Sequence, residues 1–357
     1  MYRLMIALDR GSSDPLYLQV KAGILAQIEA GAYPDGQPIP TEAEFASELG
    51  LSSLTLRRAI VELAQQGLLR RIPGRGTFVI SGAAKPPLSR VSLLLPRDVP
   101  YDLSGRFAVH LMHGLHGAIH PSTLVLRSSS TDAAELSDSQ GIVALWVIDP
   151  REMQRLAANG TPVVGYECAA DPAAPAFDNI CHANDSGSHA ATSSLINLGH
   201  TDVGCVIHAT SSGAERRAGF QRAMRQHGLP VRPERIFTVM NTGEAGYAFG
   251  RRLLADPAMA PTALVCSDDT MAVGILAAAR ELGHPVPESL SIVGFGDLGT
   301  FTTPALSSVR MDIVASGRIA VQLLQERIAN PALPPRSVVL PTEYIRRASC
   351  GPPRRGT

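Results

Sequence analysis

The chain has 357 residues, which at roughly 100–200 residues per domain is enough for two or three domains. Its 32 basic residues balance 32 acidic ones, and its composition of 45% hydrophobic and 18% charged residues is that of a globular protein. This composition excludes a wholly disordered chain, because disorder requires low hydrophobicity and high net charge. No apolar run approaches the roughly 18 residues that a membrane span needs.

The N-terminus and the cysteines indicate the compartment. The stretch before Val20 includes Asp9 and Asp14 and lacks the long apolar run of a secretory signal. The cysteines are odd in number and form no Cys-x-x-Cys pair, which favours neither a disulfide framework nor a zinc finger. They are Cys168, Cys181, Cys205, Cys266 and Cys350. We therefore expect a reduced, cytoplasmic protein with no membrane segment, no metal and no cofactor.

The first part of the chain predicts helices separated by sharp turns. Apolar residues at four-residue spacing predict a helix over Pro15–Glu29. Thr41 and Glu44 fit an S/T-x-x-E capping box, which indicates the start of a second helix. Gly50 suits the end of that helix, because glycine adopts the left-handed conformation of a C-cap without strain.

A third helix and a hairpin follow. The helix is expected from Ser52 or Ser53 to about Gln66, with its apolar residues facing inward. Two short runs, 68–72 and 77–80, flank a Pro-Gly-Arg-Gly turn and predict a two-stranded hairpin. Three short helices followed by a hairpin are typical of a winged helix-turn-helix.

Charge is uneven along the chain although its sum is zero. Between Gly50 and Ile80 five arginines face one glutamate, so this segment carries a charge of +4 and suits a nucleic-acid partner. The arginines are Arg57, Arg58, Arg70, Arg71 and Arg75. No lysine follows Lys85, which excludes Schiff-base chemistry in the rest of the chain.

The pattern changes after a small, Pro-rich stretch at 81–89, which we interpret as a linker. Apolar runs of strand length then alternate with amphipathic stretches of helix length, as in parallel sheets covered by helices on both faces. The expected strands are Val91–Leu95, Leu124–Leu126, Ile142–Ile148, Val163–Tyr166, Val203–Ile207, Leu264–Cys266 and Ile292–Phe295. The expected helices lie near Phe107–Ile119, Gly187–Leu198, Ala214–His227, Glu244–Ala255, Met271–Leu282 and Val314–Ile328. We therefore expect an α/β protein with domains at 1–80 and 90–350, the second with two lobes.

Four stretches of the first domain resemble one known family. They are PLYLQV at Pro15–Val20, IPTEAEFASELGLS at Ile39–Ser52, TLRRAIVELAQQGLLRR at Thr55–Arg71 and GRGTFV at Gly74–Val79. On these residues the chain resembles the GntR-type winged-helix regulators, which implies double-stranded operator DNA as a partner. The resemblance implies DNA contacts at Thr41, Ser52, Ser53, Thr55 and Arg57 on the helices and at Arg75, Gly76 and Thr77 in the wing.

The chemistry of these residue types supports the same interface. A helix N-terminus and small hydroxyls bind phosphate oxygens, and an arginine in the wing can enter a minor groove. The family usually carries Arg where this chain has Ser53, so the bidentate contact that such an Arg makes with guanine is missing. An alternative for Arg57 and Arg58 is a solvated helix charge or a salt bridge with Glu42 or Glu62.

Five stretches of the second domain resemble another family. They are LGH at Leu198–His200, RRAGF at Arg216–Phe220, DDTMAVG at Asp268–Gly274, VGFGD at Val293–Asp297 and PALSSV at Pro304–Val309. Their order and spacing resemble the effector domain of LacI-type regulators, which is similar to periplasmic sugar-binding proteins. The resemblance implies two lobes with a ligand cleft at their interface.

The resemblance also implies which residues contact the ligand. They are Phe107, Arg216, Asp268, Gly296 and Asp297. Arg216 would donate hydrogen bonds to hydroxyl or carboxylate oxygens, and Phe107 would stack on the ligand. The family usually has Asn at the position of Asp268 and Asp at the position of Gly296, so a carboxylate has moved from one loop to another. The alternatives are a structural ion pair for Arg216, with Glu215 or an aspartate, and a helix N-cap for Asp268.

Two other features receive no functional role. His110, His113, His116 and His120 lie at spacings of three, three and four on one predicted helix. We interpret them as a polar helix face rather than as a metal site. Trp146 ends an apolar run, and we interpret it as packing rather than as a platform for a ligand.

Other functions lack their requirements in this sequence. A pyridoxal-phosphate enzyme joined to such a head needs a lysine that the second domain lacks, and a transport protein needs a secretory signal and no such head. The strand runs argue against an all-helical, metal-binding effector domain. We predict a repressor, not an enzyme, that binds operator DNA as a homodimer and senses a sugar or sugar derivative. A non-sugar effector, or a small-molecule binding protein without a regulatory role, is the alternative.

Overall fold

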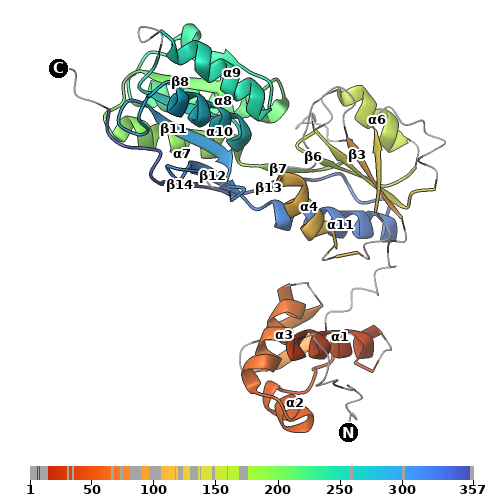
Figure 1. Cartoon of the computed structure of the whole chain (residues 1–357). Coiled ribbons are helices and arrows are strands. Elements are labelled where there is room, and N and C mark those ends of the chain that lie inside the picture. Colours follow the sequence, from red (N-terminus) through yellow and green to blue (C-terminus); the bar gives the residue numbers. More distant parts are fainter. Residues whose placement is uncertain are drawn as a thin grey trace. The chain divides into compact units, whose positions relative to one another are not determined.

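The computed structural model divides into two compact units, Met1–Pro86 and Pro87–Thr357 (Figure 1). The described residues are 6, 8, 15–29, 32–33, 36–65, 68–72, 75–79, 88, 90–95, 106–116, 118–119, 124–128, 136, 138–146, 149–158, 160–168, 176–256, 260–299 and 302–353. The predicted linker at 81–89 lies outside them except at Leu88.

The first unit packs helices around one apolar core. The helices are α1 (Leu16–Glu29), α2 (Glu42–Leu49) and α3 (Ser53–Gln65), close to their predicted bounds. The capping box is confirmed, because Thr41 accepts the backbone N–H of Glu44 and the Glu44 carboxylate accepts the Thr41 N–H. Gly50 ends α2 in the left-handed conformation with φ of 60°. Ile24 of α1 and Phe45 of α2 are among the side chains buried in the core.

Two antiparallel strands complete this unit. β1 (Leu69–Ile72) and β2 (Gly76–Val79) pair in a register that sets the first residue of β1 opposite the last residue of β2. The helices and the hairpin together form the winged helix-turn-helix that the sequence predicts. The expected turn residues Pro73 and Gly74 lie outside the described residues.

The second unit contains two six-stranded sheets, each at the centre of one lobe. In the first sheet all pairs are parallel, and the strand order is β13-β7-β6-β5-β3-β4. The strands are β3 (Val91–Leu95), β4 (Leu124–Ser128), β5 (Gly141–Leu145), β6 (Val163–Tyr166), β7 (Asp178–His182) and β13 (Ser337–Leu340). Helices α4 (Arg106–His116) and α11 (Ile313–Ala329) pack on one face of this sheet, and α6 (Pro150–Ala158) packs on the other.

The second sheet has the order β14-β12-β11-β10-β8-β9, and only its β12–β14 pair is antiparallel among the described strands. Its strands are β8 (Val203–Ile207), β9 (Ile236–Thr238), β10 (Ala263–Cys266), β11 (Ser291–Gly296), β12 (Ser307–Met311) and β14 (Thr342–Ile345). Helices α7 (Asn184–Asn197) and α8 (Ser211–Gln226) cover one face, and α9 (Gly243–Leu254) and α10 (Asp269–Glu281) cover the other. A short 3-10 helix, Pro233–Arg235, precedes β9.

Neither lobe is a continuous stretch of sequence. The chain passes between the two sheets after β7, after β12 and after β13.

Close packing of α4 on α11 depends on glycine. A Cβ atom at Gly114 would lie 2.2 Å from the Val314 carbonyl oxygen, and one at Gly317 would lie 2.7 Å from that of Leu111. Any side chain at either position would push the two helices apart.

The α/β fold class is confirmed, although several elements were not predicted: β7, β9, β12, β13, β14 and α6. In β7 and β12 buried polar residues interrupt the apolar pattern on which the prediction depends. Asp178 of β7, for example, is fully buried because Arg327 and Arg336 form ion pairs with it. None of the described helices is long and apolar enough to cross a membrane.

Candidate functional site

Helix N-termini form part of the surface on which the sequence predicts DNA contacts. At the start of α3, Ser52 Oγ accepts the backbone N–H of Thr55 at 3.2 Å and lies 2.8 Å from the Thr55 hydroxyl. Ser53, the first residue of α3, is exposed. At the start of α2, the N–H and the hydroxyl of Thr41 bind the Glu44 carboxylate and hold its pKa below its ordinary value. These hydroxyls therefore order two helix starts, and a helix start suits a phosphate oxygen.

Glutamates hold the arginines of α3. Arg57 Nε lies 3.0 Å from Glu42 Oε2, and Arg71 of β1 lies 3.5 Å from the other oxygen of the same carboxylate. Arg58 lies 3.5 Å from Glu62. These are the salt bridges that the sequence offered as an alternative to DNA contact. The Arg57 side chain is nevertheless 57% exposed, so a phosphate can still reach it.

The predicted wing contacts lie at the start of β2. Arg75 is exposed, and its backbone N–H closes the turn by bonding to the Ile72 carbonyl at 3.0 Å. Gly76 has a φ of 116°, a conformation that L side chains rarely adopt. Thr77 is half-buried and pairs with Arg71 in the hairpin. The glycine thus lets the wing turn sharply while the arginine side chain extends from it.

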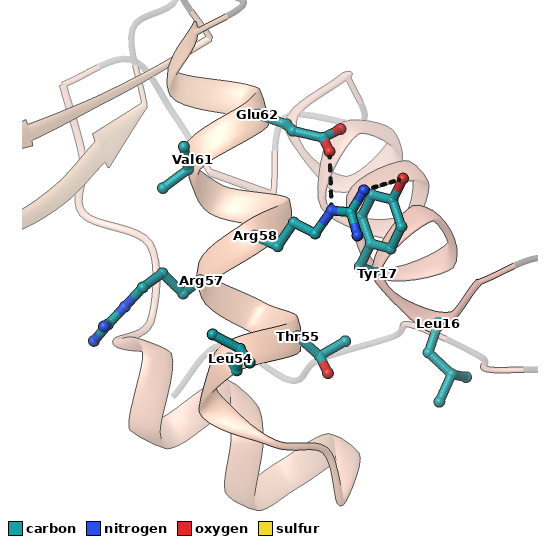
Figure 2. Close-up of a pocket in the computed structure, with 8 residues that line it drawn as sticks. All are labelled: Leu16, Tyr17, Leu54, Thr55, Arg57, Arg58, Val61 and Glu62. Atoms are coloured by element: carbon teal, nitrogen blue, oxygen red, sulfur yellow. Dashed lines mark hydrogen bonds and ion pairs between the residues drawn. The ribbon is translucent and has the colours of Figure 1, made fainter.

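A groove of about 730 Å³ runs between α1 and α3 (Figure 2). On one side of α3, Arg58 reaches across to α1, where its guanidinium lies 3.6 Å from the centre of the Tyr17 ring and donates to the Tyr17 hydroxyl at 3.0 Å. Arg57 and Val61 project on the side of α3 away from Tyr17, and Leu54 lies in front of the helix near its start. Thus Arg58 ties the two helices together, and the face of α3 that lines the groove carries both apolar and basic groups.

In the second unit, Arg216 of α8 lies inside the protein with 4% of its surface exposed. Its Nε donates to Asn184 Oδ1 at 2.9 Å, and a terminal nitrogen donates to the Ser267 carbonyl oxygen. The guanidinium carbon lies 3.9 Å from the centre of the Phe295 ring, and the other terminal nitrogen lies 3.6 Å from the sulfur of Met311. The ion pair offered as an alternative is replaced by these neutral partners.

Asn184, which is 1% exposed, joins Arg216 to two carboxylates. Its amide nitrogen donates to Glu167 and to Glu215, each at 2.9 Å. Glu167 also accepts two bonds at 2.9 Å from His182, one from the backbone N–H and one involving the ring Nδ1. Burial raises the pKa of Glu167, but the bonds from His182 and Asn184 and the charge of Arg216 outweigh it and hold that pKa below its ordinary value. Burial and the charge of Glu167 raise the pKa of Glu215.

Asp268 and Asp297, both predicted to bind ligand, already accept bonds from the protein. Asp268 caps α10 by accepting the Thr270 N–H at 2.8 Å, which is the alternative that the sequence offered. Asp297 forms ion pairs with Arg310 at 2.9 Å and with Arg347 at 2.7 Å. Burial raises the pKa of Asp297, but the hydrogen bonds from the two arginines hold it below its ordinary value.

Gly296 is the position at which the sequence indicates that a carboxylate is missing from the loop. Its φ is 129°, so a side chain there would strain the backbone. An added Cβ atom would lie 3.2 Å from Leu298 and 3.5 Å from the carboxylate of Asp269. Asp269 itself is 1% exposed, and burial raises its pKa to about 6.

Phe107 belongs to an aromatic group in the first lobe. Its ring centre lies 4.6 Å from that of Trp146 and 5.5 Å from that of Tyr166. Tyr166 is buried and makes an edge contact with His182. Trp146 packs against the core of the lobe, as the sequence predicts, but it is only half-buried.

These groups share one position in the fold, the carboxyl ends of parallel strands. Trp146 follows β5, Glu167 follows β6 and Asp297 follows β11. Ligands of open α/β sheets bind outside such ends. The two lobes also contact each other at these strand ends. The Ser211 hydroxyl of α8 donates to the Glu167 carbonyl oxygen at 3.1 Å, and the Asn184 amide of α7 donates to the Glu167 carboxylate.

Sequence reasoning missed Asn184, which bonds to Arg216, as well as Glu167, which bonds to Asn184, and His182, which bonds to Glu167. Their chain positions, directly after or within short strands, were the available signal.

His110, His113 and His116 lie on α4, and His120 lies outside the described residues. Among the described residues, no group of three or more His, Cys, Asp or Glu is arranged to hold a metal ion.

Comparison with known proteins agrees with this division. Residues 16–79 match the model of the bacterial regulatory proteins of the gntR family, and residues 192–350 match that of the periplasmic binding protein-like domain. The HTH-type transcriptional regulator GalR of Lacticaseibacillus casei is 30% identical over 286 residues, which are 74% of this chain and 82% of GalR. The arabinose metabolism transcriptional repressor of Geobacillus stearothermophilus is 28% identical over 339 residues, 88% of this chain and 91% of that repressor.

Solved structures share the fold. A complex of the transcriptional regulator CelR with cellobiose has a TM-score of 0.66 at 22% identity and covers 87% of this chain and 100% of its own. A LacI family regulator from Enterococcus faecium with bound ribose has a TM-score of 0.63 at 20% identity, covering 74% of this chain and 99% of its own. The relatives are transcription regulators rather than enzymes. This chain therefore belongs to the transcription regulators, and it joins a gntR-family DNA-binding domain to a periplasmic-binding-protein-like effector domain of the LacI type.

Proposed function

We propose that this protein is a homodimeric repressor of sugar-metabolism genes whose affinity for operator DNA changes when a sugar binds its second unit. The likeness to an arabinose metabolism repressor along 88% of this chain is the observation that carries the proposal. The sugar-bound structures of the same fold support a sugar as the class of effector. The first units of the two chains would bind two half-sites of one operator, since a dimer has two-fold symmetry.

The chemistry around Arg216 is consistent with a sugar. The weakest of its contacts is the one with the Met311 sulfur at 3.6 Å, because a thioether is a poor hydrogen-bond acceptor. A hydroxyl oxygen of a ligand is a better hydrogen-bond acceptor and would make a stronger bond with Arg216 than that sulfur does. The rings of Phe107 and Trp146 offer apolar faces for the C–H groups of a sugar. Asp268 would accept a hydrogen bond from a hydroxyl group of the sugar.

A thermal-shift panel tests the effector class. The full-length chain would be heated with L-arabinose, D-ribose, D-galactose, cellobiose and, as a non-sugar member, a purine base. A ligand at about 100 times its Kd stabilises the folded state by about 2.7 kcal/mol, which raises Tm by several degrees. Stabilisation by one sugar supports the proposal. A shift with the purine base alone would favour the non-sugar alternative.

Operator binding is tested by selecting duplexes from a random library with the full-length chain. Selected duplexes should contain two related half-sites, and their affinity should fall steeply as salt rises, because phosphate contacts release counterions. Failure to enrich any duplex would contradict the proposed function.

A further inference from the structure

Leu54 is the most exposed large apolar side chain among the described residues, with an exposed fraction of 76%. It is the second residue of α3, directly after Ser53. A leucine at the first turn of a helix makes no favourable interaction with the positive end of the helix dipole, where acidic and hydroxyl side chains are favoured. Its exposure is therefore unexplained by the stability of the unit.

The polar side chains around Leu54 are bonded within the protein. The hydroxyls of Ser52 and Thr55 bond to each other at 2.8 Å, and Arg58 is held against Tyr17. Leu54 lies one turn before Arg57, so the two side chains share a face of α3, and Arg57 is the predicted DNA contact of that helix. A helix that places Arg57 at a phosphate would thus bring Leu54 toward the base edges of the same groove.

An apolar side chain can recognise one feature of the major groove. Every base pair presents donors and acceptors there, but only thymine adds a methyl group, on C5. Ser53, the exposed residue next to Leu54, has no guanidinium with which to read guanine, so an apolar contact is another way to obtain sequence preference at this helix start. We propose that Leu54 contacts the C5 methyl group of a thymine in each half-site and so determines part of the operator specificity. This inference rests on the proposed DNA binding of the first unit.

The test uses a duplex selected from a random library by the full-length chain. Each thymine is replaced in turn by deoxyuridine, which removes the methyl group and keeps the hydrogen-bonding pattern. Replacement at one symmetric pair of positions should weaken binding. The expected loss is about fourfold for one half-site and about 15-fold for the two half-sites together, as for one apolar carbon per site. The Leu54→Ala variant should bind the unmodified duplex equally weakly and should not respond to deoxyuridine at that pair.

Val61→Ala is the matched control, because Val61 is an exposed apolar residue two turns further along α3. It should retain the full deoxyuridine response. Alanine at position 54 preserves the helix, so an unchanged Tm shows that the Leu54→Ala head is folded. The proposal is overturned if Leu54→Ala binds like the wild type, or if both proteins respond equally to every deoxyuridine. If the library yields no duplex, the proposed DNA binding itself fails.

Discussion

The two units use arginine in opposite ways. In the first unit Arg57 and Arg71 share one carboxylate, that of Glu42, and both side chains are more than half exposed. In the second unit Arg216 is almost fully buried, and each of its nitrogens contacts a different protein group. An exposed ion pair contributes little to stability, whereas a buried cation must keep its partners.

This difference has a functional consequence. A phosphate backbone lies outside the protein, so the side chains that meet it must stay exposed and exchange one partner for another at low cost. A buried guanidinium can discriminate a small ligand, because any unpaired donor inside the protein is costly. We therefore expect substitutions in the second unit to change stability and substitutions on the surface of the first unit to change DNA affinity.

The largest effect is expected for Asn184→Leu. Glu167 and Arg216 would each lose a hydrogen bond inside the protein, and the exposed Glu215 would lose one as well. We expect the free energy of unfolding of the second unit to fall by about 3–5 kcal/mol, as measured by urea denaturation. Asn197→Leu, at the exposed end of the same helix, should cost less than about 0.5 kcal/mol. Equal losses in the two variants would contradict the role of the buried network.

A stabilising substitution is expected at Asp269. Its pKa is raised from 3.8 to about 6, so between these values the folded state holds a proton that the unfolded chain has released. The free energy of unfolding therefore rises as pH falls from about 6 toward 4. Above pH 6 the full cost of burying the ionised Asp269 carboxylate is present. Asp269→Asn removes that cost and should raise the free energy of unfolding at pH 7.5 by roughly 2–3 kcal/mol.

Urea denaturation at pH 5 and at pH 7.5 checks this expectation. Asp269→Asn should make the unfolding free energies at the two pH values more nearly equal. Asp268→Asn keeps the N-cap of α10 but removes a charge that adds to the effect of burial on the pKa of Asp269, so it should reduce the difference only in part. An Asp269→Asn protein that is less stable at pH 7.5 would show that the buried carboxylate contributes to stability as an anion.

Smaller effects on stability, with clear effects on DNA, are expected in the first unit. Arg57→Ala and Arg75→Ala should each weaken operator binding by about 1–3 kcal/mol and lower the salt slope by about one. Tm should hardly change, since both side chains are exposed. Arg225→Ala, an exposed change of the same charge in the second unit, serves as the control. Anisotropy titrations in which all three variants bind alike would contradict the DNA contacts.

The sequence predicts the first unit better than the second for a physical reason. The Thr41–Glu44 capping box, the left-handed Gly50 and the helix bounds depend on neighbours along the chain, and all are confirmed. Arg216 contacts Asn184 of α7, the Ser267 carbonyl oxygen, Phe295 of β11 and Met311 of β12, which only the folded chain brings together. Resemblance identified Arg216, but no local pattern indicated Glu167 or Asn184.

Coupling between sugar binding and DNA binding is tested by measuring operator affinity with and without the sugar that stabilises the protein. Anisotropy titration of a selected duplex should show a change in Kd of about 5–150-fold, which corresponds to a coupling free energy of about 1–3 kcal/mol. Calorimetry should show that the sugar affinity changes by the same factor when the duplex is bound, because coupling is reciprocal. A sugar that binds tightly yet leaves the Kd for DNA unchanged would contradict the account.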